Sequence, residues 1–491
     1  MKVIVRMNRP EYFNDVAEEI RLFLGMPEIV LAEENADPDL SAQIQIDVMI
    51  RKTGFAYMCS VSCGAKTLKS SFLLKAQDTL TIKKVEKRQI KLLTYTVMKS
   101  LFPDVPTPWG ALTGIRPTKL FREIRDASDE QTAVREFLDL YNVSMEKTAL
   151  AAEITERQTP VISSVKPEDL DVYIGIPFCT SRCLYCSFPT QVLPSEETLD
   201  TYLEILKEDI RLGAETAQKC GKKIRAMYVG GGTPTILSSD QLRNLLSYAI
   251  EAYGGFGREL TVEAGRPDTI TLEKLQVIAD AGAERICINP QTMSDETLSR
   301  IGRSHTVDQI VETFVLARKV GFSCINMDII AGLPGETTEI FEHSVGKVLA
   351  LRPDNLTVHS LAVKRAAELK MQLDKYPLAD PQDVSQMIDF AAESARKLGL
   401  APYYMYRQKY MSGNLENVGY AKYKKESIYN IDMMEETVPI MAHGAGAITK
   451  WISRDGSRIE RVANGKDYAT YLGKVDRIES QRRELFFSEN T

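Results

Sequence analysis

The sequence predicts an α/β protein whose central part is a partial (β/α)6-type barrel, with a small α+β domain before it and an α+β region after it. Six short apolar segments between residues 172 and 358 alternate with segments of helical periodicity, which implies a parallel sheet. Polar and glycine-rich motifs follow several of these segments, at the strand ends where such barrels build their active sites. The predicted strands are 172–176, 224–229, 260–264, 285–288, 325–330 and 355–358.

The N-terminal domain, residues 1–100, contains two alternating segments that predict a β-hairpin with helices at either side. The segments are 42–50 and 55–61, joined by a short turn. Cys59 and Cys63 fall on one face of the second strand. Because cysteine is among the most frequently buried residue types, we interpret them as packing thiols rather than ligands.

Residues 101–165 are predicted to be a linker that combines helices with an ordered, irregular segment. Proline and glycine are frequent in 103–119, and both interrupt regular structure. Arg116 and Lys119 in this segment have two interpretations, as groups that reach an anionic substrate or as part of a solvated edge. The barrel is predicted to occupy residues 166–365.

Three cysteines directly after the first barrel strand form the most specific motif of the chain. Cys179, Cys183 and Cys186 have Cys-x3-Cys-x2-Cys spacing, and three thiolates on one tight loop hold three corners of a [4Fe-4S] cluster. One iron of the cluster then keeps an open coordination position, which usually indicates a catalytic rather than a structural site. Zinc is disfavoured because the next cysteine is Cys220 and none of the four histidines lies near the loop. An odd cluster of three also disfavours a disulfide framework, and buried free thiols are the remaining alternative.

Further motifs surround the cysteines. They are Ile176-Pro-Phe178, Tyr185, Gly230-Gly-Gly-Thr-Pro-Thr235, Ile301-Gly-Arg-Ser-His305, Met327-Asp-Ile-Ile-Ala-Gly-Leu-Pro-Gly335 and His359-Ser-Leu-Ala362. In this order, over about residues 170 to 450, they resemble the radical S-adenosylmethionine (SAM) superfamily, and within it the oxygen-independent coproporphyrinogen III oxidase family and its haem-chaperone relatives. The chain is most similar to the divergent coproporphyrinogen dehydrogenase branch of Gram-positive bacteria. The resemblance implies a radical SAM barrel that uses a [4Fe-4S] cluster and S-adenosyl-L-methionine.

The resemblance also implies which residues bind these cofactors. Cys179, Cys183 and Cys186 are the implied metal ligands. The implied SAM contacts are Tyr173, Tyr185, Gly231, Gly232, Thr233, Glu263, Gln291, Arg303, Asp328 and Ala362. Among these, Glu263 is implied to take the cationic part of SAM and Arg303 its carboxylate. Gln291 and Asp328 are implied to bind the ribose region of SAM. The glycine turn is implied to bind the amino group of its methionyl part through the backbone. Each has an ordinary alternative, a strand-end cap for the carboxylates and a surface ion pair for Arg303.

The implied activity is the oxygen-independent oxidative decarboxylation of coproporphyrinogen III propionates to vinyl groups, which forms protoporphyrinogen IX in porphyrin and haem biosynthesis. Two departures bear on it: Gly175 stands where the family usually has histidine, and Phe188 stands where characterised decarboxylating members have a fourth cysteine. The alternatives are a haem-binding chaperone, in which His359 or His443 would ligate haem, and a radical SAM enzyme that acts on another tetrapyrrole. The implied partners are the tetrapyrrole and a reducing electron donor such as flavodoxin or ferredoxin.

The C-terminal region, residues 366–491, is predicted to cover the substrate. Its aromatic and basic strip, residues 402–410, has two interpretations. Aromatic faces with Arg407 and Lys409 suit a tetrapyrrole with propionates, and the same pattern is typical of an ordinary amphipathic strand.

Composition places the chain among ordinary globular proteins, with 44% hydrophobic and 26% charged residues. The formal charge of −6 disfavours a general nucleic-acid binder. No apolar run approaches the ~20 residues of a membrane span, and the N-terminus lacks the pattern of a signal peptide. The sequence therefore predicts a cytoplasmic enzyme with no nucleic-acid partner and no membrane span.

Overall fold

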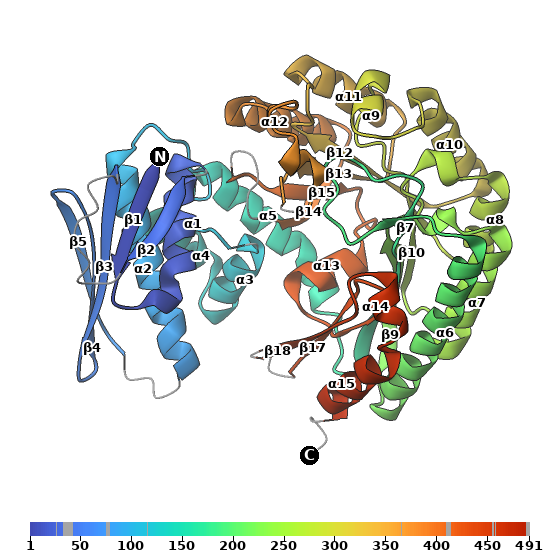
Figure 1. Ribbon diagram of the computed structural model, residues 1–491, viewed down its shortest axis with the longest axis horizontal. Coiled ribbons are helices and arrows are strands. Elements are labelled where there is room, and N and C mark those ends of the chain that lie inside the picture. The colour runs from blue at the N-terminus through green and yellow to red at the C-terminus, as the bar shows by residue number, and fades with distance from the viewer. Residues whose placement is uncertain are drawn as a thin grey trace. The chain divides into compact units, whose positions relative to one another are not determined.

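A computed structural model describes the chain in residues 1–25, 27–32, 43–74, 79–114, 116–364, 366–408, 414–453, 456 and 458–487. The chain forms two compact units, Met1–Ala152 and Glu153–Thr491. Each unit is built around a sheet of its own (Figure 1). Within these described ranges, no helix is long and apolar enough to cross a membrane.

The first unit contains a five-stranded sheet with the order β2-β1-β3-β4-β5, drawn in blue in Figure 1. β1 is parallel to both of its neighbours, and the remaining pairs are antiparallel. β3 and β4 form the predicted hairpin. Cys59 is buried in the core of this unit and Cys63 packs against it, which confirms that they are packing thiols. The strands are β1 (Lys2–Met7), β2 (Glu28–Ala32), β3 (Ile44–Thr53), β4 (Ala56–Cys63) and β5 (Lys66–Leu73).

Helices complete the core of the first unit. Val16 and Ile20 of α1, together with Ile90 and Val97 of α2, are fully buried against the sheet. Trp109, in the irregular segment after α2, is also fully buried. The helices are α1 (Phe13–Leu24), α2 (Thr79–Leu101), α3 (Pro117–Ala127), α4 (Glu130–Arg135), the π-helix η2 (Glu136–Leu140) and α5 (Met145–Ile162), which continues into the second unit.

The second unit is built on an eleven-stranded sheet with the order β14-β15-β13-β12-β11-β10-β9-β6-β16-β17-β18. Its six central strands are parallel, and each overlaps a predicted strand, so the predicted partial barrel is confirmed. Six of the eight residues of β6 are buried, because a parallel sheet is covered on both faces. The central strands are β6 (Asp169–Ile176), β9 (Lys223–Gly231), β10 (Glu259–Glu263), β11 (Arg285–Cys287), β12 (Cys324–Ala331) and β13 (Asn355–Ser360).

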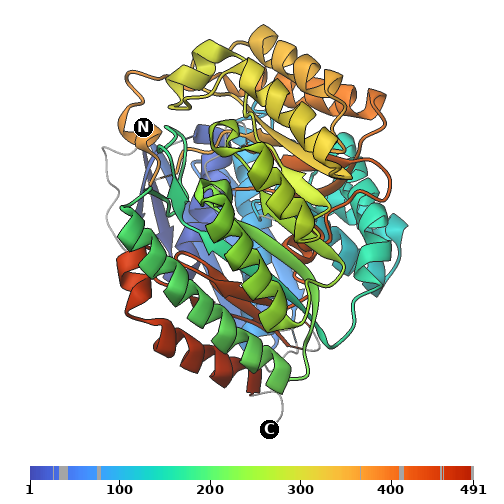
Figure 2. The same cartoon turned by 90° about the vertical axis from the view of Figure 1, so that its right-hand side faces the viewer.

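Helices cover the outer face of the central strands (Figures 1 and 2). Ser238 and Gln241 form the predicted capping box at the start of α7, and Gly254 ends this helix in the left-handed conformation. Gly321 ends α10 in the same way. The helices are α6 (Glu196–Lys219), α7 (Ser239–Tyr253), α8 (Leu272–Asp280), α9 (Asp295–Arg300), α10 (Val307–Val320) and α11 (Thr338–Ala350).

The C-terminal region extends the sheet at both of its edges. β15 joins β13 in antiparallel orientation, and β16 joins β6 in parallel orientation, with Ile440 opposite Asp171. One sheet therefore contains strands of both the predicted barrel and the predicted C-terminal region, while the functional division of the chain into four parts stays a prediction. The added elements are β14 (Ala401–Tyr406), β15 (Asn417–Ala421), β16 (Ile440–His443), β17 (Ile448–Ile452), β18 (Ile459–Ala463), α12 (Pro381–Lys397), α13 (Ile428–Glu435), α14 (Tyr468–Leu472) and α15 (Val475–Phe487).

A buried ion-pair network attaches the C-terminal helix to the barrel. α15 lies alongside α6 (Figure 2), and Arg482 of α15 pairs with Asp209 of α6, with both side chains fully buried. Asp209 also accepts a hydrogen bond from the Tyr471 hydroxyl at 2.7 Å. His443 belongs to the same network: its Nδ1 lies 3.1 Å from Asp209 Oδ1 and its Nε2 lies 2.6 Å from the Tyr253 hydroxyl. His443 is thus a fully buried structural residue rather than an accessible haem ligand.

Candidate functional site

The three cysteines lie on a loop that is closed at its base. After β6, the short strands β7 (Phe178–Cys179) and β8 (Gln191–Val192) pair in parallel, so residues 179–192 form a closed segment, here named the cysteine loop. All three cysteines are free thiols. Cys183 is buried and the other two are half-buried.

Backbone hydrogen bonds anchor the cysteine loop to two other segments of the barrel. The Leu184 N–H donates to the Ile301 carbonyl at 3.0 Å, and the Leu369 N–H donates to the Leu184 carbonyl at 2.9 Å. Arg182 Nη2 donates to the Ala366 carbonyl at 2.7 Å. These contacts place the loop between the segment after α9 and the segment after β13.

The cysteine loop offers the sulfur atoms of three free cysteines as donor atoms. Burial raises the pKa of Cys179, and the charges of Cys183 and Cys186 raise it further, whereas a hydrogen bond from the Thr233 hydroxyl lowers it. That hydroxyl lies 3.4 Å from the Cys179 sulfur. Across the described ranges, no three His, Cys, Asp or Glu side chains converge on a single metal ion. Three thiolates on one loop are the donor set that an iron–sulfur cluster uses.

The glycine turn after β9 packs directly on the cysteine loop. The Gly232 N–H donates to the Ile176 carbonyl at 2.7 Å, and the Thr233 N–H donates to the Phe178 carbonyl at 2.9 Å. A Cβ atom on Gly232 would lie 2.5 Å from the Phe178 oxygen and 3.0 Å from the Cys179 sulfur. The chain itself therefore requires glycine here, because a larger residue would displace the cysteine loop.

Glu263 ends β10 and faces three tyrosines inside the barrel. The Tyr228 hydroxyl donates to Glu263 Oε1 at 2.5 Å. Tyr228 stacks on Tyr429 of α13 with ring centroids 4.7 Å apart, and both rings stack on Tyr173 of β6. The pKa of Glu263 is raised to about 7, chiefly by burial, with the hydrogen bond from Tyr228 acting in the opposite direction. This carboxyl therefore changes its charge near neutral pH.

The pKa of Asp328 on β12 is shifted in the opposite direction from that of Glu263. Asn326 Nδ2 donates to Asp328 Oδ1 at 2.7 Å, and His359 Nε2 lies 3.5 Å from Asp328 Oδ2. Burial raises the pKa of Asp328, but His359 and Asn326 lower it more, so the pKa lies below its ordinary value. His359 Nδ1 in turn lies 3.2 Å from the Tyr406 hydroxyl. The site thus contains two carboxyl groups with different charge behaviour: Asp328 stays ionised, whereas Glu263 takes up a proton near neutral pH.

Gln291 and Arg303 are buried polar residues with unsatisfied atoms. Gln291 has a φ of 69°, which is uncommon for a residue with a side chain, and its N–H donates to the Asp328 carbonyl at 2.9 Å. Arg303 donates to the Asn289 carbonyl at 2.6 Å and to the Tyr185 hydroxyl at 3.3 Å. Gln291 Oε1 and Arg303 Nε have no hydrogen-bond partner in the described part of the chain. Because buried polar atoms are normally satisfied, these atoms indicate a site for a bound polar molecule.

The structure gathers most of the predicted site residues at the C-terminal ends of the central strands. Gly231 ends β9, Ala362 follows β13 by two residues, and Tyr173 lies deeper on β6. Tyr228 and Tyr429 were not singled out from the sequence. Tyr228 stands two residues before the glycine turn, which is a usable signal, whereas Tyr429 comes from α13 and belongs to no motif. The individual contacts with SAM stay predictions.

The aromatic strip of the C-terminal region forms β14. Tyr403 and Tyr404 are buried in a core cluster, as the ordinary-strand interpretation expects. Arg407 is buried and donates to the Asn414 carbonyl at 2.9 Å. Lys409 lies outside the described residues. Within the described structure, Tyr406 of this strip reaches the predicted site through its contact with His359.

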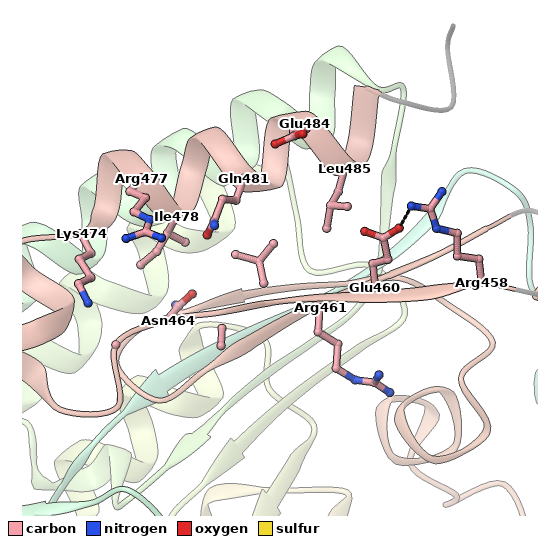
Figure 3. Close-up of a pocket in the computed structure, with 13 residues that line it drawn as sticks. Arg458, Glu460, Arg461, Asn464, Lys474, Arg477, Ile478, Gln481, Glu484 and Leu485 are labelled. Carbon is pink, nitrogen blue, oxygen red and sulfur yellow. Dashed lines mark ion pairs between the residues drawn. The ribbon is translucent and has the colours of Figure 1, made fainter. Parts of the chain in front are cut away.

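A separate groove of about 590 Å³ lies between β18 and α15 (Figure 3). Lys474 and Arg477 line its helical side, and Arg458 and Glu460 at the strand form an ion pair. No predicted site residue lines this groove. It is therefore distinct from the site at the end of the barrel.

Comparison with known proteins identifies the family. Residues 173–348 match the radical SAM superfamily. The oxygen-independent coproporphyrinogen-III oxidase-like protein HemZ of Bacillus subtilis is 40% identical over 412 residues, which cover 82% of this chain and 82% of HemZ. This chain belongs to the coproporphyrinogen oxidase-like family of radical SAM proteins. The predicted cofactors, a [4Fe-4S] cluster and SAM, are those of the radical SAM superfamily.

Two further relatives place the family in context. The heme chaperone HemW of Bacillus subtilis is 33% identical over 236 residues, which cover 47% of this chain and 61% of HemW. The solved structure of coproporphyrinogen III oxidase (HemN) from Escherichia coli matches with a TM-score of 0.51 at 22% identity, over 68% of this chain and 78% of HemN. The HemN match confirms the predicted fold class. The family therefore includes relatives that are named as oxidases and relatives that are named as chaperones.

Proposed function

We propose that this protein decarboxylates propionate side chains of coproporphyrinogen III to vinyl groups without oxygen, and so forms protoporphyrinogen IX in the cytoplasm. The observation that carries the proposal is the extent of the match to HemZ, 82% of both chains, which is long enough to include part of the first unit. The match to HemW covers only 47% of this chain. The two matches therefore favour the oxidase-like assignment over the chaperone.

In this proposal the cysteine loop holds a [4Fe-4S] cluster, and the residues at the end of the barrel hold SAM. When bound, these cofactors would supply the radical chemistry that removes a hydrogen atom from the β-carbon of a propionate. Loss of carbon dioxide and one electron from the side chain then leaves a vinyl group. Each decarboxylation therefore requires an electron acceptor, and a reduced flavodoxin or ferredoxin is the proposed electron donor.

The charges of the site suit SAM, which carries a sulfonium, an ammonium and a carboxylate. Arg303 is a buried cation whose pKa burial lowers but Tyr185 and Cys183 raise more, so it remains charged and suits the carboxylate. Asp328 remains an anion and accepts hydrogen bonds from ribose hydroxyls. Glu263, when ionised, attracts the cationic part. The stacked tyrosines beside Glu263 exclude water and so strengthen these interactions.

The raised pKa of Glu263 predicts a pH-dependent affinity for SAM. Glu263 is mostly protonated below pH 7 and ionised above it, so the form that attracts a cation increases with pH. Between about pH 6 and pH 8 the ionised fraction rises about tenfold, and we expect the dissociation constant of SAM to fall by a similar factor. Isothermal titration calorimetry on the reconstituted protein measures this change. Glu263→Gln should bind SAM weakly, with an affinity that does not depend on pH. If this variant instead keeps the pH dependence of the wild type, Glu263 does not contact SAM.

The reaction is tested by strictly anaerobic incubation with coproporphyrinogen III, SAM and a reductant, followed by chromatography of the tetrapyrroles. We expect a monovinyl intermediate and then protoporphyrinogen IX, with one 5′-deoxyadenosine formed per vinyl group. SAM consumption with intact coproporphyrinogen III would reject this substrate.

The second candidate function is haem delivery, and Phe188 favours it. Phe188 replaces the fourth cysteine of the characterised decarboxylating members, as in the chaperone branch, and it is 66% exposed within the cysteine loop, two residues after Cys186. Because His443 is fully buried, His359 is the histidine that this function would use. A haem complex whose Soret band shifts in His359→Ala, together with no turnover of coproporphyrinogen III, would establish the carrier instead.

A further inference from the structure

The groove between β18 and α15 contains two cations that no carboxylate neutralises directly. Within the described structure, Lys474 and Arg477 are exposed and form no ion pair. Lys474 attracts the Asp467 carboxylate, which already accepts hydrogen bonds from Thr470 as the cap of α14. The other charged residues of the lining are Arg458, paired with Glu460, Arg461, paired with Glu436, and the carboxylate Glu484.

These two cations lie together at one end of the groove. Figure 3 shows Lys474 and Arg477 at the end where Asn464 lies, whereas Arg458 is at the opposite end. Lys466, an exposed residue two positions after Asn464, adds a third cation to this part of the chain. We name Lys466, Lys474 and Arg477 the basic end of the groove. Because the whole chain has a formal charge of −6, this excess of positive charge is local.

The basic end of the groove adjoins the cysteine loop. Gly465, which lines the groove, accepts a hydrogen bond from the Gly446 N–H at 2.7 Å. Gly446 lies against Pro189 of the cysteine loop, because a Cβ atom on Gly446 would lie 2.6 Å from Pro189 Cγ. The Tyr468 ring lies beside the Phe178 ring of β7, with centroids 6.1 Å apart. The segment that leads from the groove into α14 is therefore attached to the cysteine loop at two places.

The cysteine loop exposes large apolar side chains next to this attachment. Phe188, which directly precedes Pro189, is 66% exposed, and Val192 and Leu193 are 59% and 40% exposed. Exposed apolar side chains on one short segment are typical of an interaction surface, and protein interfaces combine an apolar centre with a polar rim. The cysteine loop and the basic end of the groove together offer both parts.

The exposure of the cations determines which kind of partner fits this surface. An exposed lysine or arginine contributes little to binding a single small anion, because water screens the pair. A protein with an acidic surface forms many such weak interactions at once, and the charges also guide its approach. Among the described residues that line the groove, none is an aromatic on which a nucleic-acid base could stack. The surface therefore fits an acidic protein.

The proposed function requires a protein that gives one electron to the cluster, and electron transfer between proteins requires the two redox centres to lie close together. We propose that the basic end of the groove and the adjoining cysteine loop form the docking surface of a small, acidic electron-carrier protein. The carrier is oxidised by one electron and the cluster is reduced by one electron, and no bond is made or broken. This inference rests on the cluster of the proposed function.

The test measures the affinity of the full-length reconstituted protein for an acidic flavodoxin by isothermal titration calorimetry at low and high salt. Binding to the wild type should weaken as salt screens the charges. Lys474→Glu/Arg477→Glu should raise the dissociation constant at low salt by about tenfold and reduce its salt dependence. Both positions lie at the N-terminal end of α15, where glutamate suits the helix dipole, so the fold should remain stable.

Reduction of the cluster, followed in stopped-flow experiments without any tetrapyrrole, is the second measurement. Reduction by flavodoxin should slow by a similar factor in Lys474→Glu/Arg477→Glu, whereas iron content and reduction by dithionite should match the wild type. The matched control is Lys223→Glu/Lys319→Glu, which reverses two exposed lysines at the start of β9 and near the end of α10. These positions lie at the opposite end of the barrel from the cysteine loop, so this control should bind flavodoxin as the wild type does.

The outcomes separate the docking surface from its alternatives. An unchanged affinity in Lys474→Glu/Arg477→Glu overturns the inference, and so does an equal loss in the control, which would show an effect of net charge alone. Competition by inorganic phosphate at constant ionic strength would assign the groove to a small anion instead. A wild-type protein that binds neither flavodoxin nor an acidic ferredoxin also overturns it.

The failure of the proposed function would look different. If flavodoxin reduces the cluster through this surface but coproporphyrinogen III stays intact, the proposed substrate is wrong and the docking surface stands. A wild-type protein that loads no cluster would contradict the proposed function, and the inference would fall with it.

Discussion

Replacing Cys183 by alanine is expected to abolish both the iron–sulfur chromophore and the cleavage of SAM. Cys183 is the buried member of the three cysteines, and the cysteine loop offers no fourth thiol to take its place. A cluster held by two thiolates would be incomplete, so the wild type should contain about four iron atoms per chain after anaerobic reconstitution and the variant close to none. Iron and sulfide analysis, the visible spectrum and the yield of 5′-deoxyadenosine check this result.

Cys220→Ala is the matched control for Cys183→Ala. Cys220 is a half-buried cysteine at the end of α6, and its sulfur lies 3.5 Å from the Phe486 carbonyl in the helix α15. Its removal should change neither iron content nor SAM cleavage. A full cluster in Cys183→Ala, or an equal loss of iron in Cys220→Ala, would contradict the assignment of the cysteine loop.

Arg482→Met is expected to destabilise the second unit by about 3–5 kcal/mol, because it leaves Asp209 as a buried charge without its cation. Burial raises the pKa of Asp209, but Arg482 and His443 lower it by more than burial raises it. The net pKa lies below its ordinary value, so the wild-type carboxyl is ionised. Without Arg482 the carboxyl must either stay charged in the core or take up a proton, and both cost free energy. The cluster should stay intact in this variant, since Arg482 lies on α15 and its hydrogen bonds in the described structure go to Asp209, Thr449, Asn464 and the Ala442 carbonyl.

The fluorescence of Trp451 measures this loss of stability in the second unit. It is buried in a core cluster with Phe486 of α15, and the only other tryptophan, Trp109, belongs to the first unit. In a Trp109→Phe background, the midpoint of the urea transition followed by tryptophan fluorescence therefore measures the second unit. Arg483→Met removes the adjacent, partly exposed arginine and should shift the midpoint little. Equal midpoints for the two variants would show that the buried pair adds no stability.

The sequence was sufficient to predict the central strands and the position of the site. Continuous apolar segments identify buried parallel strands, and the motifs fall after them because parallel strands present their C-terminal ends together. β16 was missed because it has four residues and pairs with a strand far away in the sequence. β17 and β18 depend on β16 and were missed with it.

Side-chain roles in the site were predicted less completely than positions. The approach of Gly232 to SAM stays a prediction, whereas in the structure a Cβ at Gly232 would meet the Phe178 carbonyl, and this contact depends on the fold of the cysteine loop. His443 looked like a candidate ligand because its burial and its contacts with Asp209 and Tyr253 exist only after α6, α7 and β16 pack together. Such features depend on tertiary structure, and no local pattern encodes them.

The pairing of β6 with β16 has a consequence for synthesis. The strand that leads into the cysteine loop receives one of its two neighbours about 270 residues later, when Ile440 becomes available opposite Asp171. At the usual elongation rate of about 5–20 residues per second, the ribosome needs roughly 15 to 50 s to make that partner. During this interval the edge of β6 is open and the cysteines belong to an incomplete sheet. The sheet that carries the cysteine loop is therefore completed only after residue 440 has been made, although the backbone anchors of the loop at Ile301 and Leu369 are made earlier.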